Sequence, residues 1–130
     1  MTITMSLELE EGTDIKEVAS VLASMDAQYE VEDFYLTGNF KKSNCYFVFR
    51  EFPNSEDVVV DGVAEIWRVG MNGAFHCSSA LLLECSEDIK LFLLKFSAKS
   101  SSRFALSFQY ESLYVLRDRL GVHFIKEMIG

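Results

Sequence analysis

The sequence predicts a single α+β domain over residues 1–130, in which two or three helices pack on one mostly antiparallel sheet to make two layers. Strict alternation of apolar and polar residues indicates half-buried strands, and two stretches with apolar residues at helical spacing indicate amphipathic helices. Of the 130 residues 49% are hydrophobic, including 11 Phe, 5 Tyr and 1 Trp, which suffices for one core. No linker or change in composition divides the chain.

The first third is expected to begin with a strand and continue into a helix. Over residues 2–10 the apolar side chains from Ile3 to Leu9 alternate with polar ones, which places Glu8 and Glu10 on a solvent-facing side. Gly12-Thr13-Asp14 breaks this alternation, and Thr13 suits the N-cap of a helix over residues 14–26.

Aromatic, strand-like segments occupy the middle of the chain. Strands are expected at residues 29–36 and 45–49, separated by a turn at Gly38-Asn39, and the second is apolar on both faces, as is typical of a central strand. Residues 53–57 have the composition of a loop. Strands at residues 63–69 and 74–85 are expected to form a hairpin across Met71-Asn72-Gly73, because Asn-Gly is a strong turn signal.

The last third contains the second helix. Ser86 suits its N-cap, and apolar residues from Ile89 to Phe96 lie at helical spacing before the serine tract at residues 100–102. A strand follows at residues 103–110, then a short helix at about residues 112–120 that Gly121 closes. Residues 122–128 are expected to form a final strand or to continue that helix.

Cysteine and histidine could supply a metal or nucleophilic site, but their spacing does not favour one. The chain contains Cys45, Cys77, Cys85, His76 and His123 without a C-x-x-C pattern or a close histidine pair. Alternation puts Cys77 and Cys85 on one strand face and His76 on the other, so only His123 could serve as base to a thiolate. We therefore expect buried cysteines that pack as small apolar residues, with no metal, no cofactor and no catalytic residue.

Charge is the most informative feature of the composition. The net charge of −8 and a pI near 4.7 argue against binding nucleic acid through its phosphates. The first 33 residues hold nine acidic side chains and one basic residue, Lys16. Consecutive elements are usually neighbours, so these acids are expected to form one negative surface that attracts a basic partner; the alternative is a solvated face with no partner.

Residues later in the chain extend this candidate surface. Asp33 and Glu65 each stand where the strand pattern calls for an apolar residue, and an exposed Trp67 beside a carboxylate would be typical of an interface, although tryptophan is more often buried. The candidate partner-binding residues are Glu8, Glu10, Glu11, Asp14, Glu17, Glu30, Glu32, Asp33, Glu65 and Trp67.

The sequence gives no sign of export or membrane insertion. The N-terminus MTITMSLELEEG lacks the basic start and apolar stretch of a secretory signal, and the longest apolar runs, such as residues 80–83, are far shorter than the ~20 residues that cross a bilayer. Three cysteines make a poor disulfide framework. We expect a cytoplasmic protein that binds neither membrane nor nucleic acid.

A small acidic α+β domain whose negative charge lies between Glu8 and Asp33 resembles, in overall character over the whole chain, the bacterial immunity proteins of toxin–antitoxin and contact-dependent inhibition systems. The resemblance rests on no diagnostic motif, so it assigns a role to no single residue. It implies tight binding to a basic toxin domain, often a nuclease, whose substrate site the carboxylates occupy in place of phosphates. The protein would act as a monomer or homodimer.

Three other functions remain open from the sequence. The first is a small-ligand or lipid-binding module with aromatic side chains lining a cavity, namely Phe47, Phe49, Trp67, Phe104 and Phe108. The second is a dimer of the secretion-chaperone type. The third is an enzyme, such as a hydrolase that uses carboxylates, with a site assembled from scattered residues.

Overall fold

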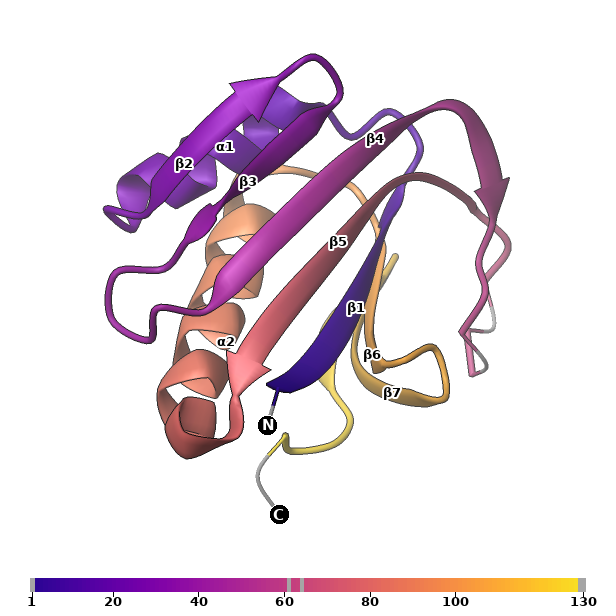
Figure 1. Ribbon diagram of the computed structural model, residues 1–130. Helices are drawn as coiled ribbons and strands as arrows, with labels where there is room; N and C mark the ends of the chain where they lie inside the picture. Colours follow the sequence, from indigo (N-terminus) through magenta and orange to yellow (C-terminus); the bar gives the residue numbers. More distant parts are fainter. Residues whose placement is uncertain (1, 61, 64, 129–130) are drawn as a thin grey trace.

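The computed structural model describes residues 2–60, 62–63 and 65–128 and confirms the predicted α+β class. One eight-stranded sheet, antiparallel throughout, has the strand order β2-β3-β4-β5-β1-β6-β7-β8. Both α-helices cover the same face of this sheet (Figure 1). The elements are β1 (Thr2–Glu10), α1 (Ile15–Ser24), β2 (Gln28–Glu32), β3 (Tyr35–Asn39), β4 (Tyr46–Asp57), β5 (Arg68–Ser78), the 3-10 turn η1 (Ser79–Leu81), α2 (Leu82–Lys99), β6 (Phe104–Phe108), β7 (Ser112–Asp118) and β8 (Gly121–Phe124).

The main core lies between the sheet and the two helices. Its centre is a group of fully buried phenylalanines whose neighbouring rings have centroids 4.9–6.4 Å apart. β1 occupies the middle of the sheet, and its apolar side chains Met5, Leu7 and Leu9 face this core as the alternation predicts. The buried rings belong to Phe40, Phe47, Phe49, Phe75, Phe92, Phe96 and Phe104.

The hairpin predicted across residues 71–73 is wrong, because these residues lie inside the continuous strand β5. β5 pairs with β1 on one side and β4 on the other, so backbone hydrogen bonds to both neighbours keep this segment extended. A Cβ on Gly73 would lie 2.7 Å from the ring of Phe49. The glycine therefore makes room for an aromatic ring and does not form a turn.

The strand predicted at residues 74–85 and the helix start at Ser86 are also wrong. β5 ends at Ser78, and α2 begins at Leu82, so Ser86 is a buried residue within the helix. The short apolar run before Ser86 fits a strand and a helix equally well by periodicity. In the first helix, Asp14 is the N-cap in place of Thr13, and its carboxylate accepts a hydrogen bond of 2.8 Å from the backbone N–H of Lys16.

Three further boundaries differ from the sequence-based expectation. The segment at residues 29–36 forms two strands, because Asp33 adopts a left-handed conformation (φ 52°) and reverses the chain, while Gly38 and Asn39 belong to β3. The predicted loop at residues 53–57 is the irregular end of β4, where the register against β5 shifts. The predicted helix at 112–120 is β7, which turns near Gly121 (φ 132°) into β8.

Candidate functional site

The most exposed part of the sheet is its β2 edge. β2 pairs only with β3 among the described residues, so the backbone N–H and C=O groups along its outer side have no strand partner. All five β2 residues, Gln28 to Glu32, are exposed. An unpaired strand edge of this kind is a ready template for a strand from another chain.

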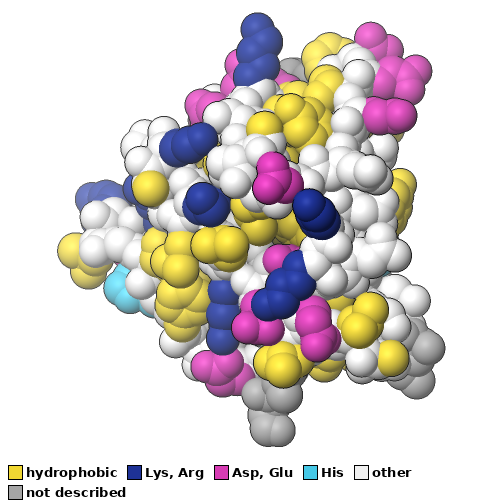
Figure 2. All heavy atoms as spheres, turned by 90° about the vertical axis from the view of Figure 1, so that its left-hand side faces the viewer, with side chains coloured by type: hydrophobic (Ala, Val, Ile, Leu, Met, Phe, Trp, Pro, Cys, Tyr) yellow, Lys and Arg dark blue, Asp and Glu magenta, His cyan; other side chains and the backbone are white. Residues whose placement is uncertain are grey.

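Acidic and apolar side chains alternate along this edge. Glu30 and Glu32 share the open face of the sheet, and Asp33 follows at the turn. None of the ion pairs between described residues involves these three carboxylates. Figure 2 shows acidic side chains beside hydrophobic ones at the upper end of the molecule, the end at which β2 turns into β3 in Figure 1. This edge combines negative charge with unpaired backbone.

Large apolar side chains lie between the carboxylates and are unusually accessible. Val31 points to the helix side of β2, while Phe34 lies in the turn and Tyr35 begins β3, with exposed fractions of 49%, 57% and 49%. Tyr29 on β2 and Tyr46 on β4 are also exposed. Aromatic residues are enriched at protein-binding surfaces relative to the rest of a protein's surface. We call Tyr29–Tyr35 together with Tyr46 the β2 surface.

Two acids of the first helix lie at the same end as this surface. α1 packs against β2 and runs in the opposite direction, so its first turn lies near the end of β2 (Figure 1). Asp14 is exposed, and Glu17 is half-buried with one carboxylate oxygen that has no hydrogen-bond partner among the described residues. Glu11 is exposed just beyond β1. Of the predicted residues, Asp14, Glu30, Glu32 and Asp33 are therefore exposed at this end of the molecule and Glu17 is half-buried there.

Glu8 does not lie on a solvent-facing side, so that prediction is wrong. Its side chain is 1% exposed because the segment at residues 58–60 folds over the open face of the sheet. The carboxylate accepts hydrogen bonds from the backbone N–H groups of Val59 (2.7 Å) and Val60 (3.2 Å). Burial raises the pKa of Glu8, and these two hydrogen bonds oppose the increase. Glu8 anchors this segment and does not face a partner.

Glu10 and Glu65 are held by arginines. Arg103 Nη2 contacts Glu10 Oε2 at 2.8 Å and Arg103 Nη1 contacts Glu65 Oε1 at 3.3 Å, while Arg119 Nε contacts Glu65 Oε2 at 2.7 Å. The hydrogen bond from Arg103 lowers the pKa of Glu10, and that from Arg119 lowers the pKa of Glu65. This network joins the end of β1 to the segments around residues 65, 103 and 119, and it neutralises both acids.

Trp67 is not an exposed anchor, because only 5% of it is accessible. It packs with Val60, Val69 and Ala105 in a second apolar cluster on the open face of the sheet. Its indole N–H has no partner among the described atoms. Of the other aromatic residues suggested as the lining of a ligand cavity, Phe47, Phe49 and Phe104 are fully buried in the main core, across the sheet from Trp67. Phe108 is half-buried and lines a small apolar hollow of about 200 Å³ beside Ile3 and Tyr114.

A shallow hollow lies along the β2 surface. Its volume is about 350 Å³, and Gln28, Glu30, Thr37, Asn39 and Tyr46 line it. The lining is mainly polar, which suits contact with a polypeptide better than enclosure of an apolar ligand. The hollow therefore continues the accessible surface from β2 across β3 to β4.

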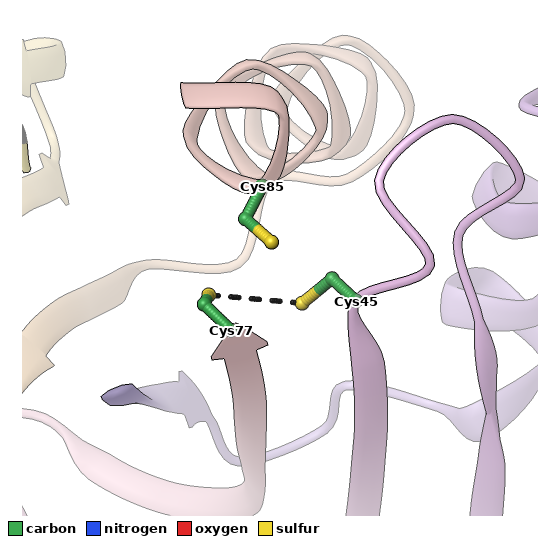
Figure 3. A group of neighbouring side chains, drawn as sticks. All are labelled: Cys45, Cys77 and Cys85. Atoms are coloured by element: carbon green, nitrogen blue, oxygen red, sulfur yellow. Dashed lines mark hydrogen bonds between the residues drawn. The ribbon is translucent and has the colours of Figure 1, made fainter. Parts of the chain in front are cut away.

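The three cysteines are buried, as predicted, and the fold brings them together in the core. Cys45 precedes β4, Cys77 lies near the end of β5, and Cys85 is in the first part of α2; all three are buried (Figure 3). The Sγ atoms of Cys45 and Cys77 are 3.8 Å apart, and all three sulfur atoms lie within 4.8 Å of one another. The strand register was the missing signal, since pairing Tyr46 with His76 sets Cys45 beside Cys77.

The thiols of this cluster differ in acidity. The hydrogen bond with Cys77 and burial together raise the pKa of Cys45, whereas the same hydrogen bond lowers the pKa of Cys77. Burial raises the pKa of Cys85 to about 11. Cys77 is therefore the thiol of the cluster whose charged form its hydrogen bond favours. His76 points away from it and bonds Thr4 Oγ1 through Nδ1 at 3.0 Å, so no histidine base serves this thiol.

Comparison of the chain with known protein families, with curated proteins and with solved structures found no match. Neither helix in the described part of the chain is both long enough and apolar enough to span a bilayer.

Proposed function

We propose that the protein is an acidic protein-interaction module whose β2 surface binds a basic segment of a partner. The observation that carries this proposal is the exposed edge strand β2, whose outer side has no strand partner among the described residues and along which Glu30 and Glu32 alternate with Tyr29 and Val31. We further propose, from the overall resemblance to immunity proteins, that the partner is a basic toxin domain that the protein neutralises in the cytoplasm.

The chemistry of the edge defines the segment that fits it. An extended peptide added beside β2 would form backbone hydrogen bonds along the whole strand, as in other cases of strand addition. Because side chains alternate between the two faces, a peptide with basic residues at every second position would place them beside Glu30 and Glu32. Its other residues would meet Tyr29 and Val31. Long-range attraction by the net charge of −8 would also speed association.

The acidic residues of β2 disfavour pairing of this strand with the β2 strand of a second copy of the chain. Two β2 strands paired antiparallel and centred on Val31 place Glu30 opposite Glu32 twice. Like charges directly opposite each other in a sheet are destabilising. A homodimer of the secretion-chaperone type is therefore disfavoured at this surface.

The test compares the wild-type protein with two double charge reversals. Glu30→Lys with Glu32→Lys alters the β2 surface, while Glu56→Lys with Glu111→Lys changes the charge equally at exposed acids elsewhere. Glu8 and Glu10 are unsuitable because they hold the fold together. Each protein is used to capture partners from the native host. Each captured protein is then expressed alone, with the wild type and with each of the two variants, and its toxicity is measured.

We expect the wild-type protein and the control to capture a basic protein and to relieve its toxicity, and the β2 variant to do neither. Capture of a non-toxic basic protein that depends on Glu30 and Glu32 would support the interaction surface and overturn the immunity role. Equal capture and protection by all three proteins would overturn the β2 surface as the binding site.

A further inference from the structure

We propose that Cys45, Cys77 and Cys85 form a three-coordinate thiolate site for a monovalent soft metal ion, Cu(I). The proposal is independent of the β2 surface, because it concerns residues buried in the core. It begins from the convergence of three side chains from three separate elements, whose sulfur atoms point toward a common centre (Figure 3).

The spacing of the sulfur atoms suits a metal ion. A metal–thiolate bond of about 2.3 Å sets ligand sulfurs about 3.8 Å apart in a tetrahedral site and about 4.0 Å apart in a trigonal one. Cys45 and Cys77 are 3.8 Å apart, and the third sulfur lies within 4.8 Å of both. A movement of Cys85 Sγ of less than about 1 Å would complete a trigonal set, which is well within the reach of a side-chain torsion.

The number and kind of ligands distinguish Cu(I) from zinc. Structural zinc sites almost always have four ligands, and the cluster contains only three side chains of a metal-binding type among the described residues. The two histidines do not supply a fourth, since His76 bonds Thr4 on the open face and His123 bonds Asp118 at the surface. Soft thiolate ligands select Cu(I), zinc and iron–sulfur clusters among the common metals. Zinc and the iron–sulfur clusters call for four protein ligands, whereas three thiolates suffice for Cu(I).

Polar groups around the cluster favour the thiolate form of the cysteines. Cys85 lies near the N-terminus of α2, where backbone N–H groups favour negative charge. The backbone N–H of Cys45 donates a hydrogen bond of 3.1 Å to the Ser43 hydroxyl, which places a polar group beside the cluster. Each thiol that binds the ion releases its proton to solvent, so the apparent affinity is expected to rise with pH.

Two surface segments, the η1 turn and the loop between β3 and β4, border the cluster. The η1 turn follows directly after β5 and has no side-chain cap, and Leu81 and Leu83 beside it are exposed. On the other side, the loop between β3 and β4 is held by a hydrogen bond of 3.0 Å from the Ser43 N–H to Asp88 Oδ2. A bound ion would tie β4, β5 and α2 together and stabilise the folded state.

The experiment loads the reduced, metal-free protein with Cu(I) under anaerobic conditions and challenges it with a Cu(I) chelator. We expect about one copper per chain to be retained, X-ray absorption to show three sulfur neighbours, and the thermal unfolding midpoint to rise. Zn(II) offered in the same way is expected to be removed by a chelator. The wild-type spectrum tests the proposal even where cysteine variants fold poorly.

Variants identify the ligands. Cys85→Ala is expected to lower Cu(I) affinity at least about tenfold, since loss even of a residue supporting a ligand typically costs that much. His76→Ala, next to Cys77 but on the other face, is the matched control and should bind as the wild type does. Wild-type protein that keeps its far-UV circular dichroism yet retains no copper, or copper with two sulfur neighbours only, would overturn the proposal. Unchanged affinity in Cys85→Ala would do the same.

Discussion

A buried carboxylate is costly unless it is well hydrogen-bonded, and Glu8 shows how this chain uses one. Its two oxygens accept from the N–H groups of Val59 and Val60, which fixes the segment at residues 58–60 over the open face of the sheet. Beneath that segment the Trp67 cluster excludes water. One acidic residue of the central strand thus positions a loop far from it in sequence.

Replacing Glu8 by Ala is expected to reduce the free energy of unfolding by about 1–3 kcal/mol. The buried N–H of Val60 would lose its acceptor, and the small side chain would leave space beneath the segment. Urea denaturation measures the change. Glu11→Ala, at the exposed end of β1, is the control and should change stability by less than about 0.5 kcal/mol. An equal effect of both substitutions would contradict the anchoring role.

The pKa of Glu10 predicts how the free energy of unfolding depends on pH in the acid range. Its pKa in the folded protein lies below the ordinary value of 4.5 because Arg103 holds it. As the pH falls below about 4.5, the unfolded chain binds a proton before the folded protein does, and the free energy of unfolding decreases. Glu10→Gln should therefore be less stable than wild type at neutral pH, yet lose less stability between about pH 5 and pH 3. Urea midpoints across this range give the comparison.

The pKa of Glu8 is shifted in the opposite direction to that of Glu10, so Glu8 serves as the control for this experiment. Because its pKa in the folded protein is raised, its effect is to decrease the free energy of unfolding as the pH increases above 4.5. Glu8→Gln should remove that decrease and leave the acid-side slope from Glu10 in place. A Glu10→Gln profile parallel to wild type below 4.5 would show that the Arg103 contact contributes nothing to acid unfolding.

At the scale of the elements, strict alternation and helical spacing located three of them well. Nine alternating residues defined β1, and helical spacing located most of α1 and α2. The predictions failed where a local pattern fits two structures and pairing with a strand distant in the sequence decides between them. Asn72-Gly73 is a turn pattern in isolation, but pairing with β1 and β4 keeps it in a strand. The apolar spacing of residues 112–120 fits a helix, but pairing with β6 makes this segment the strand β7.

The Gly73 contact gives a test at this scale. Gly73→Ala would place its methyl carbon 2.7 Å from the Phe49 ring, so we expect a loss of about 1–3 kcal/mol from the free energy of unfolding as the core rearranges. Asn72→Ala, the neighbouring residue on the open face, is the control and should cost less than Gly73→Ala. Guanidinium denaturation of both variants distinguishes them. A larger loss from Asn72→Ala would indicate that the turn signal, and not the ring, governs this segment.

The same dependence on distant partners limited prediction of the sites. Sequence located Glu30, Glu32 and Asp33 as acidic but could not show that β2 is an edge, which follows from the order of strands in the whole sheet. It placed Glu8 on a solvent-facing side and left Trp67 as either an interface or a core residue, because no local pattern reveals that residues 58–60 fold over the open face of the sheet. The cysteine cluster required both the β4–β5 register and the true start of α2.

At the scale of the whole molecule, the acidic residues of the first third fall into two groups, one buried or ion-paired and one accessible. Glu8 and Glu10 are turned inward or paired with arginine, whereas Glu30, Glu32 and Asp33 remain unpaired among the described ion pairs at the β2 edge. The charge that remains accessible thus lies where the backbone is also unpaired. Charged residues on an open edge are a common means of preventing strands of identical chains from joining.

That reasoning predicts the oligomeric state. Repulsion between like edges should keep the wild-type protein monomeric, and replacing Glu30 and Glu32 by Gln with Asp33 by Asn should allow β2 to pair with itself through its backbone and apolar side chains. Light scattering with size-exclusion chromatography over a range of concentrations measures the mass of each. The same neutralisation at Glu56, Glu111 and Asp57, which lie away from β2, is the control and should stay monomeric. A wild-type dimer at low ionic strength, where repulsion is strongest, would show that another surface joins two chains and that the β2 charges do not serve to keep them apart.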